Sequence, residues 1–98
     1  MLTPKQRQHL KALAHPLKPL LRVGKGGFSP SQAEELEGLL EAHELVKVKL
    51  NQNTFEDAGS MLAALQARIE GLEHVWTIGH TLLLFRPSRN KPTRYPLS

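Results

Sequence analysis

A glycine-rich loop that carries one lysine is the segment of this chain whose residue types could do chemistry. Gly24, Lys25, Gly26 and Gly27 follow an apolar run at 19–23, and a helical pattern begins after them. Glycine lets a backbone approach a ligand closely, and the free N–H groups of a following helix favour an anion. The loop therefore predicts either a site for phosphate, with Lys25 adding a positive charge, or simply a tight turn.

The spacing of these glycines distinguishes between the known phosphate-binding loops. A Walker loop needs four residues between its glycines and then Gly-Lys-Ser/Thr, which this segment lacks. A dinucleotide fingerprint would use Gly24, Gly26 and Ser29, but no acidic residue ends a second strand at the required place. The pair Gly24 and Gly27 does match the GxxG loop with which KH domains hold a nucleic-acid backbone. The spacing favours nucleic acid over a free nucleotide.

The charges are segregated along the 98 residues, whose formal net charge is +4. Residues 26–85 hold all nine acids, whereas residues 1–25 and the segment from Arg86 onward hold none. The basic residues of the first segment are Lys5, Arg7, Lys11, Lys18, Arg22 and Lys25. Two basic segments that flank an acidic middle are typical of a protein with a polyanionic partner, most commonly nucleic acid.

Other chemistry finds little support in the residues. The chain has no cysteine, and its five histidines have no metal-ligand spacing; His9 and His15, six apart, do not share a helix face. Acid pairs such as Glu34 and Glu35 fall on a solvated helix face. We expect no catalytic residue, no metal site and no cofactor. No apolar run is long enough for a membrane span, and we expect a monomeric, cytoplasmic protein.

Hydrophobic periodicity predicts one domain with the order α-β-α-β-α-β-β. Thr3 and Ser29 are the expected N-caps of the first two helices, and Thr54 with Asp57 predicts a capping box for the third, which Gly71 stops. The apolar stripe of the first helix is expected to include Leu13. Strands are expected at 19–23, at the alternating segment 45–50, and on both sides of a hairpin turn at Gly79-His80.

The two strand–helix–strand units imply parallel pairing, and the final hairpin makes the sheet mixed. The predicted fold is therefore a single compact α/β domain over residues 1–87, with a four-stranded mixed sheet and helices packed on it. Residues 88–98 have the composition of a basic flexible tail.

Four side chains of the predicted strands have two possible roles. Lys47 and Lys49 point away from the apolar face of 45–50, where contact with RNA and a plain solubility role are equally plausible. Trp76 and Phe85 could stack on bases, but large aromatic side chains in a small domain favour the core, which is the expectation here.

Three ordered motifs make the chain resemble a known family. The segments "LAHPLKPLLRVGKGG", "HELVKVKL" and "IGHTLLLFRP" are similar to those of the CRM domain, an RNA-binding module of chloroplast splicing factors whose stand-alone bacterial form is the YhbY family. The resemblance runs from about Leu2 to Pro87. It implies a fold similar to the C-terminal domain of the third bacterial translation initiation factor.

The resemblance also implies RNA binding through the GxxG loop, in which Gly24 and Gly27 match the paired glycines and Lys25 and Gly26 the variable pair. His80 stands where a basic residue is expected. Stand-alone members are associated with precursors of the large ribosomal subunit, so large-subunit ribosomal RNA or a pre-50S particle is the expected partner. The expected RNA-binding residues are Gly24, Lys25, Gly26, Gly27, Lys5, Arg7, Lys11, Lys18, Arg22, Lys47 and Lys49. The alternative is an adaptor whose acidic second helix binds a basic ribosomal protein.

Overall fold

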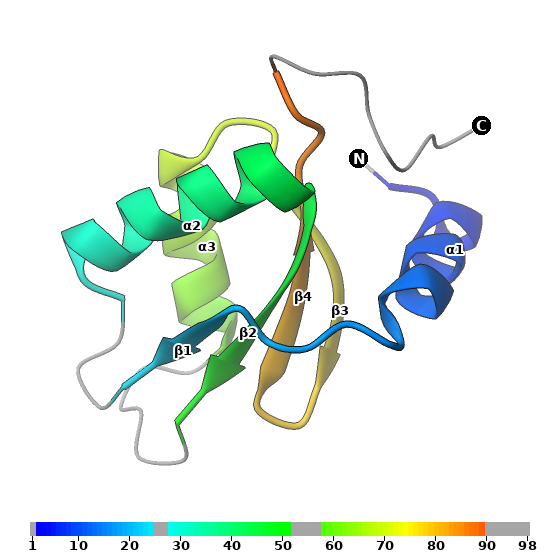
Figure 1. The fold of residues 1–98 in the computed structure, drawn as a ribbon, viewed down its shortest axis with the longest axis horizontal. Coiled ribbons are helices and arrows are strands. Elements are labelled where there is room, and N and C mark those ends of the chain that lie inside the picture. Colours follow the sequence, from blue (N-terminus) through cyan, green and yellow to red (C-terminus); the bar gives the residue numbers. More distant parts are fainter. Residues whose placement is uncertain (1, 25–27, 52–57, 90–98) are drawn as a thin grey trace.

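The predicted order of helices and strands is confirmed by the computed structural model, which describes residues 2–24, 28–51 and 58–89 (Figure 1). The described elements are α1 (Pro4–Ala14), β1 (Leu21–Val23), α2 (Pro30–His43), β2 (Leu45–Leu50), α3 (Ala58–Arg68), β3 (Glu73–Ile78) and β4 (Thr81–Phe85).

The first two helices begin at the predicted caps. The Ser29 hydroxyl accepts from the Gln32 backbone N–H at 3.2 Å, and the Gln32 side chain accepts from the Ser29 N–H at 3.3 Å. Thr3 and Gln6 form the same reciprocal pair at the start of α1. Each box satisfies two N–H groups that would otherwise lack a helical partner. The box predicted at Thr54 lies outside the described residues.

The sheet is mixed, with the strand order β1-β2-β4-β3. β1 pairs parallel with β2, and β4 pairs antiparallel with both β2 and β3. The expectation of two adjacent parallel pairs was therefore half right. β2 and β3 do run parallel, but β4 lies between them because the last hairpin folds back into the middle of the sheet.

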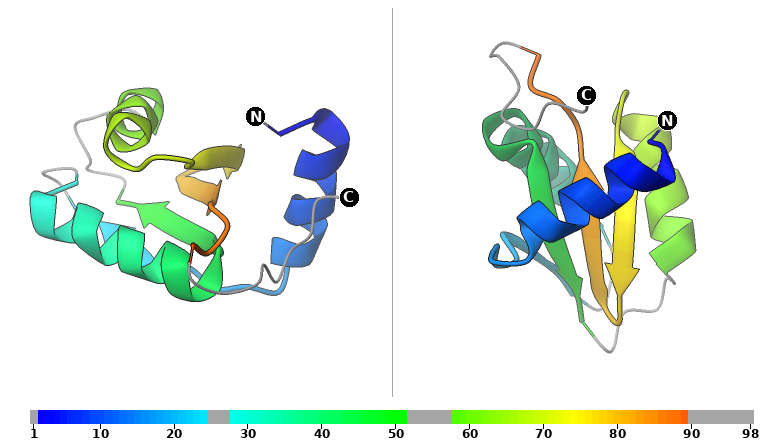
Figure 2. Two further views of the ribbon diagram at one scale, coloured as in Figure 1. Left: turned by 90° about the horizontal axis from the view of Figure 1, so that it is seen from above. Right: turned by 90° about the vertical axis from the view of Figure 1, so that its right-hand side faces the viewer.

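The helices cover the two faces of the sheet unequally (Figure 2, left). α2 and α3 pack on one face over a core that includes Val46, Val48, Leu82 and Leu84. α1 packs on the other face over a smaller core that includes Leu10, Leu45, Val75 and Phe85. A single helix cannot cover a four-stranded sheet, so part of this second face has no helix of the described residues packed on it.

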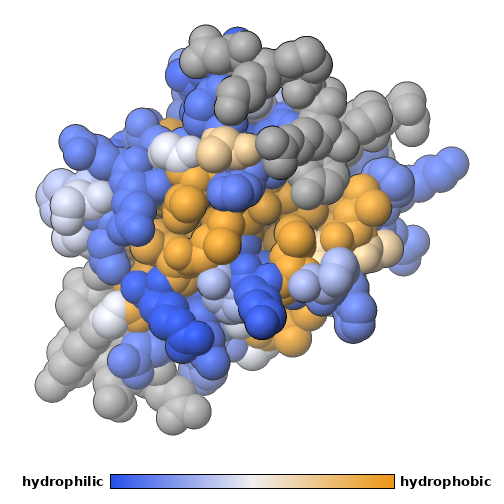
Figure 3. Space-filling model, viewed as in Figure 1, coloured by the Kyte–Doolittle hydropathy of each residue, from blue (hydrophilic) through white to orange (hydrophobic). Residues whose placement is uncertain are grey.

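Two predicted core residues are consequently at the surface. Leu13 is 41% exposed and Trp76 is 42% exposed, so assigning them to the core was wrong, whereas Phe85 is buried as predicted. Both positions belong to the α1 side of the molecule, where there is no second helix to cover them. Figure 3 shows, in the view of Figure 1, an apolar surface across the middle of the molecule with hydrophilic side chains projecting over its lower part.

A buried ionic cluster joins the end of α2 to the end of β4. Glu44 follows α2 with φ +64° and is 1% exposed, and Arg86 is 6% exposed. The Arg86 guanidinium donates to the Glu41 carboxylate at 2.8 Å. The Glu44 carboxylate accepts from the Ser88 N–H at 2.8 Å, and its backbone oxygen accepts from the Arg86 N–H.

Candidate nucleic-acid interface

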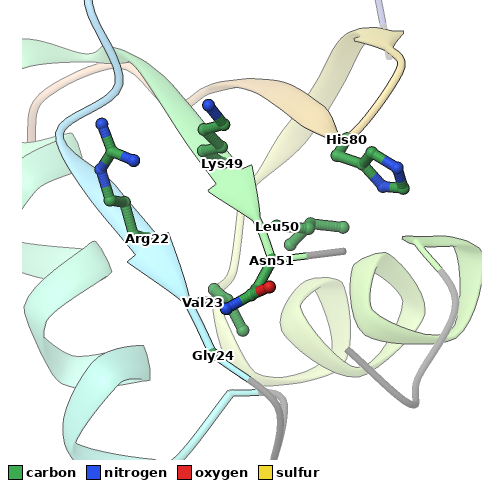
Figure 4. Close-up of a pocket in the computed structure, with 7 residues that line it drawn as sticks. All are labelled: Arg22, Val23, Gly24, Lys49, Leu50, Asn51 and His80. Carbon is green, nitrogen blue, oxygen red and sulfur yellow. The ribbon is translucent and has the colours of Figure 1, made fainter. Parts of the chain in front are cut away.

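A groove of about 460 Å³ lies at the end of the sheet where β1 and β2 finish and the β3–β4 hairpin turns (Figure 4). We call it the sheet-end groove; its lining residues are Arg22, Val23, Gly24, Lys49, Leu50, Asn51 and His80. Backbone hydrogen bonds hold its three segments together. The Asn51 N–H donates to Val23 at 2.8 Å, and the Leu50 N–H donates to His80 at 2.6 Å.

Two cations project side by side from the wall of this groove. Arg22 and Lys49 are register partners on the parallel strands β1 and β2, so their side chains leave the sheet on the same face (Figure 4). Both are exposed. None of the described residues that line the groove is acidic. The arrangement favours a ligand with successive negative charges.

The first glycine of the predicted loop opens onto this groove. Gly24 is exposed, and a Cβ built on it would meet no atom within 4 Å. Its φ is not in the left-handed region, so the backbone conformation does not require a glycine at this position. The open space is what a close backbone approach by a phosphate requires. Lys25, Gly26 and Gly27 lie outside the described residues.

The remaining predicted cations divide into exposed and engaged groups. Lys5 and Lys18 are exposed, on α1 and on the connection to β1. The Arg7 guanidinium donates to the His74 carbonyl at 2.5 Å, and the Lys47 ammonium donates to the Leu17 carbonyl at 2.9 Å. The Lys11 ammonium lies 3.8 Å from the centre of the Trp76 ring. Arg7, Lys11 and Lys47 therefore join α1 and its connection to the sheet.

Comparison with known proteins identifies the family of this chain. The family described as the CRS1/YhbY (CRM) domain matches residues 2–86. The chain belongs to this family. The resemblance inferred from its motifs is thereby confirmed.

The relatives of this CRM-domain chain match it over nearly their full length. The Bacillus subtilis protein YqeI, named a probable RNA-binding protein, is 39% identical, with 98% of this chain and 100% of the relative covered. A Haemophilus influenzae protein named an RNA-binding protein is 37% identical, with 97% and 95% covered. The solution structure of a Staphylococcus aureus protein, described as a candidate RNA-binding protein, aligns with a TM-score of 0.77 at 35% identity and covers 98% of this chain and 100% of the other.

Sequence reasoning missed two contributions to the groove of this CRM domain. Asn51 was not singled out, because an asparagine after a strand is an ordinary turn residue. His80 was predicted as a turn residue and was linked to RNA binding only through the family resemblance; the structure places it across the groove from Arg22 and Lys49 (Figure 4). The signal that could have found both is the position of each directly after a strand or within a turn at the same end of the sheet.

Two of the acidic side chains of α2 form ion pairs within the CRM domain. Glu41 binds Arg86, and Glu37 lies 3.6 Å from Arg68. Glu34 and Glu35, near the start of α2, are exposed, and the Glu37 side chain is 42% exposed in its pair with Arg68. The surface that the adaptor hypothesis requires is therefore reduced.

One histidine near α1 has a shifted pKa. Burial, with a contribution from the positive charge of Arg7, lowers the pKa of His74, although a backbone hydrogen bond with Trp76 acts in the opposite direction. The imidazole is 2.6 Å from the Thr77 hydroxyl. The neutral form of His74 is therefore favoured at the junction of α1 and β3.

Within residues 2–24, 28–51 and 58–89, no three histidine or carboxylate side chains form a group that could hold a metal ion. In the same ranges, no helix is both long and apolar enough to cross a bilayer.

Proposed function

We propose that this CRM domain binds RNA with the sheet-end groove and the adjoining glycine loop. The observation that carries the proposal is the pair Arg22 and Lys49, which face the same side at the mouth of a groove whose described lining has no acid. Relatives that match nearly the whole chain are named as RNA-binding proteins, which supports the same ligand.

The phosphate backbone is the part of RNA that this groove suits. Gly24 leaves open space at the groove, and α2 starts shortly after the loop, at Pro30 behind the N-cap Ser29. Helix N-termini and glycine loops both stabilise phosphate. We assign Gly24, Lys25, Gly26 and Gly27 to the backbone contact, with Arg22 and Lys49 beside them and Lys5 and Lys18 at longer range.

The proposed RNA is a precursor of large-subunit ribosomal RNA, and the proposed role is in assembly of that subunit. This target rests on the family resemblance, which associates stand-alone members with such particles. Sequencing the RNA that crosslinks to the protein in cells tests it directly. Crosslinks spread evenly over unrelated RNAs would contradict it.

The salt dependence of binding tests the groove itself. If about five phosphates are neutralised, the logarithm of the binding constant should fall against the logarithm of salt concentration with a slope on the order of −4. Arg22→Gln should weaken binding and make the slope shallower by roughly 0.7–0.9, the contribution of one phosphate contact. The measurement is a titration of structured ribosomal RNA at four salt concentrations.

Arg68→Gln is the matched control for this experiment. It also removes one exposed arginine charge, but from α3, on the other face of the sheet. We expect its slope to equal that of the wild type. If the two variants lose the same slope and affinity, net charge alone controls binding and the groove is not the site.

A further inference from the structure

The α1 side of the sheet has a half that none of the described helices covers. Below α1 the lower parts of β2, β4 and β3 are visible without a helix in front of them (Figure 2, right). The strand register orders the side chains that point to this side into two rows. The first row is Arg22, Lys49, Thr81 and Ile78, and the second is Lys47, Leu83 and Trp76. We call these two rows the open sheet face.

Charge and hydrophobicity are separated across the open sheet face. Its β1–β2 half carries three cations, and its β4–β3 half carries apolar and aromatic side chains. Trp76 is 42% exposed and Ile78 is 62% exposed, and they are neighbours on the same strand. A shallow hollow between this half and α1 is lined by Trp76, Ile78 and Thr81, with Lys11 and His15 at its border. Single exposed apolar residues are ordinary, but an exposed aromatic–aliphatic pair bordered by cations indicates a binding surface.

We infer that the open sheet face binds unpaired bases of single-stranded RNA, with Trp76 as the stacking platform. The inference rests on the proposed function and adds the kind of RNA that is recognised. Arg22 and Lys49 belong both to the sheet-end groove and to the first row of this face. A strand whose phosphates lie along these cations would place its bases over β4 and β3. Aromatic stacking beside a basic track is the common device for binding single strands.

Lys11 occupies the ring before RNA arrives. Its ammonium lies over the Trp76 ring at 3.8 Å from the centroid, in an exposed cation–π contact. Base–aromatic stacking is stronger than a cation–π contact that is open to water. A base therefore displaces the ammonium, and Lys11, still next to the bound strand, becomes available to a phosphate. Lys11 thus contacts the Trp76 ring in the free protein and a phosphate in the complex.

A fluorescence titration tests this inference, because Trp76 is the only tryptophan in the chain. The probes are a short oligouridylate and an abasic ribose–phosphate chain of the same length, which has the same charge and no bases. We expect the oligouridylate to bind more tightly and to quench the tryptophan emission. The abasic chain should bind more weakly and leave the emission nearly unchanged.

Substitutions supply the second arm of the test. Trp76→Ala should weaken oligouridylate binding about tenfold to hundredfold, the usual effect of losing one base stack, and Trp76→Phe should retain most of the affinity. Leu13→Ala is the matched control, since Leu13 is 41% exposed on the same side of the molecule and lies outside both rows. Circular dichroism establishes that each variant is folded. If Trp76→Ala does not fold, the comparison of the two probes on the wild-type protein still shows whether bases contribute to binding.

The outcomes separate this inference from the proposed function. If both probes bind with equal affinity and the emission stays unchanged, Trp76 does not stack on bases and this inference is wrong. The same result is expected if the open sheet face binds another protein instead of RNA. Binding of structured RNA through Arg22 would then still stand. If neither structured RNA nor either probe binds, the proposed function and this inference are both wrong.

Discussion

Arg86 is the residue whose environment departs most from its apparent role in the sequence. It begins the acid-free C-terminal segment of the sequence, yet its side chain is 7% exposed and donates to Glu41 beside the buried Glu44. Removing the guanidinium takes a charged hydrogen bond from the partly buried Glu41 carboxylate and a positive charge from beside the buried Glu44. We expect Arg86→Ala to lower the free energy of unfolding by about 1.5–3 kcal/mol, measured by urea denaturation.

Arg68→Ala is the comparison for Arg86. It breaks the pair with Glu37, whose side chains are 43% and 42% exposed. Exposed pairs contribute about 1 kcal/mol or less, so this variant should stay close to the wild type. Equal losses from both variants would show that the Arg86 cluster is no more than a surface ion pair.

Gly24 allows the structural and functional roles of a glycine to be separated. Its φ is ordinary and a methyl group would meet open space, so Gly24→Ala should leave the free energy of unfolding unchanged or raise it by up to about 1 kcal/mol. The same methyl group would stand in the sheet-end groove, where we expect it to weaken RNA binding. Thermal unfolding and an RNA titration on the same sample check both effects.

Gly79→Ala is the control at the other turn of the groove. Gly79 has φ +56°, a conformation that costs a residue with a side chain about 1–2 kcal/mol. This variant should be less stable than the wild type, in contrast to Gly24→Ala. Unchanged RNA affinity in Gly24→Ala would mean that no phosphate approaches that backbone.

At the scale of the elements, β2 carries two lysines with different roles. Lys47 is half-buried and donates to the Leu17 carbonyl at 2.9 Å, whereas Lys49 is exposed in the groove. Lys47→Ala should lower the free energy of unfolding by about 1–2 kcal/mol through the lost charged hydrogen bond. Lys49→Ala should change stability by less than about 0.5 kcal/mol and weaken RNA binding more than Lys47→Ala does. If Lys47→Ala weakens RNA binding more than Lys49→Ala does, the phosphates bind closer to α1 than we propose.

The elements were predictable where local chemistry determines them. The capping boxes at Thr3 and Ser29 and the alternation in 45–50 depend on neighbours within a few residues, so they could be read from the sequence. The exposure of Trp76 could not, because it depends on how far α1 reaches across the sheet. The pairing of Arg86 with Glu41 joins positions 45 apart along the chain, and no periodicity reports such a contact. Only part of the groove could be predicted from the sequence. Arg22 and Gly24 lie next to the loop and in it, whereas His80 is brought to the groove by the order of strands in the sheet.

At the scale of the whole molecule, the end of the domain can be tested by truncation. Composition predicts a boundary at residue 87, but Ser88 and Arg89 donate backbone hydrogen bonds to Glu44 and Glu41, and the Arg89 guanidinium donates to the Glu70 carbonyl at 3.0 Å. A chain ending at Pro87 loses these bonds and should be less stable by about 1–3 kcal/mol. A chain ending at Arg89 retains them. Equal melting temperatures for the two truncations would support the boundary at 87.

The strand order has a consequence for the protein's own synthesis. β4, the last of the described strands along the chain, lies between β2 and β3, so a nascent chain that lacks residues 81–85 has no strand to join those two. Such a chain exposes the inward side chains of both strands, which are apolar surfaces prone to aggregation. The groove is also incomplete at this stage, because His80 is delivered by the same hairpin. The protein therefore acquires a stable sheet and its binding surface together, only after residue 85 has left the ribosome that makes it.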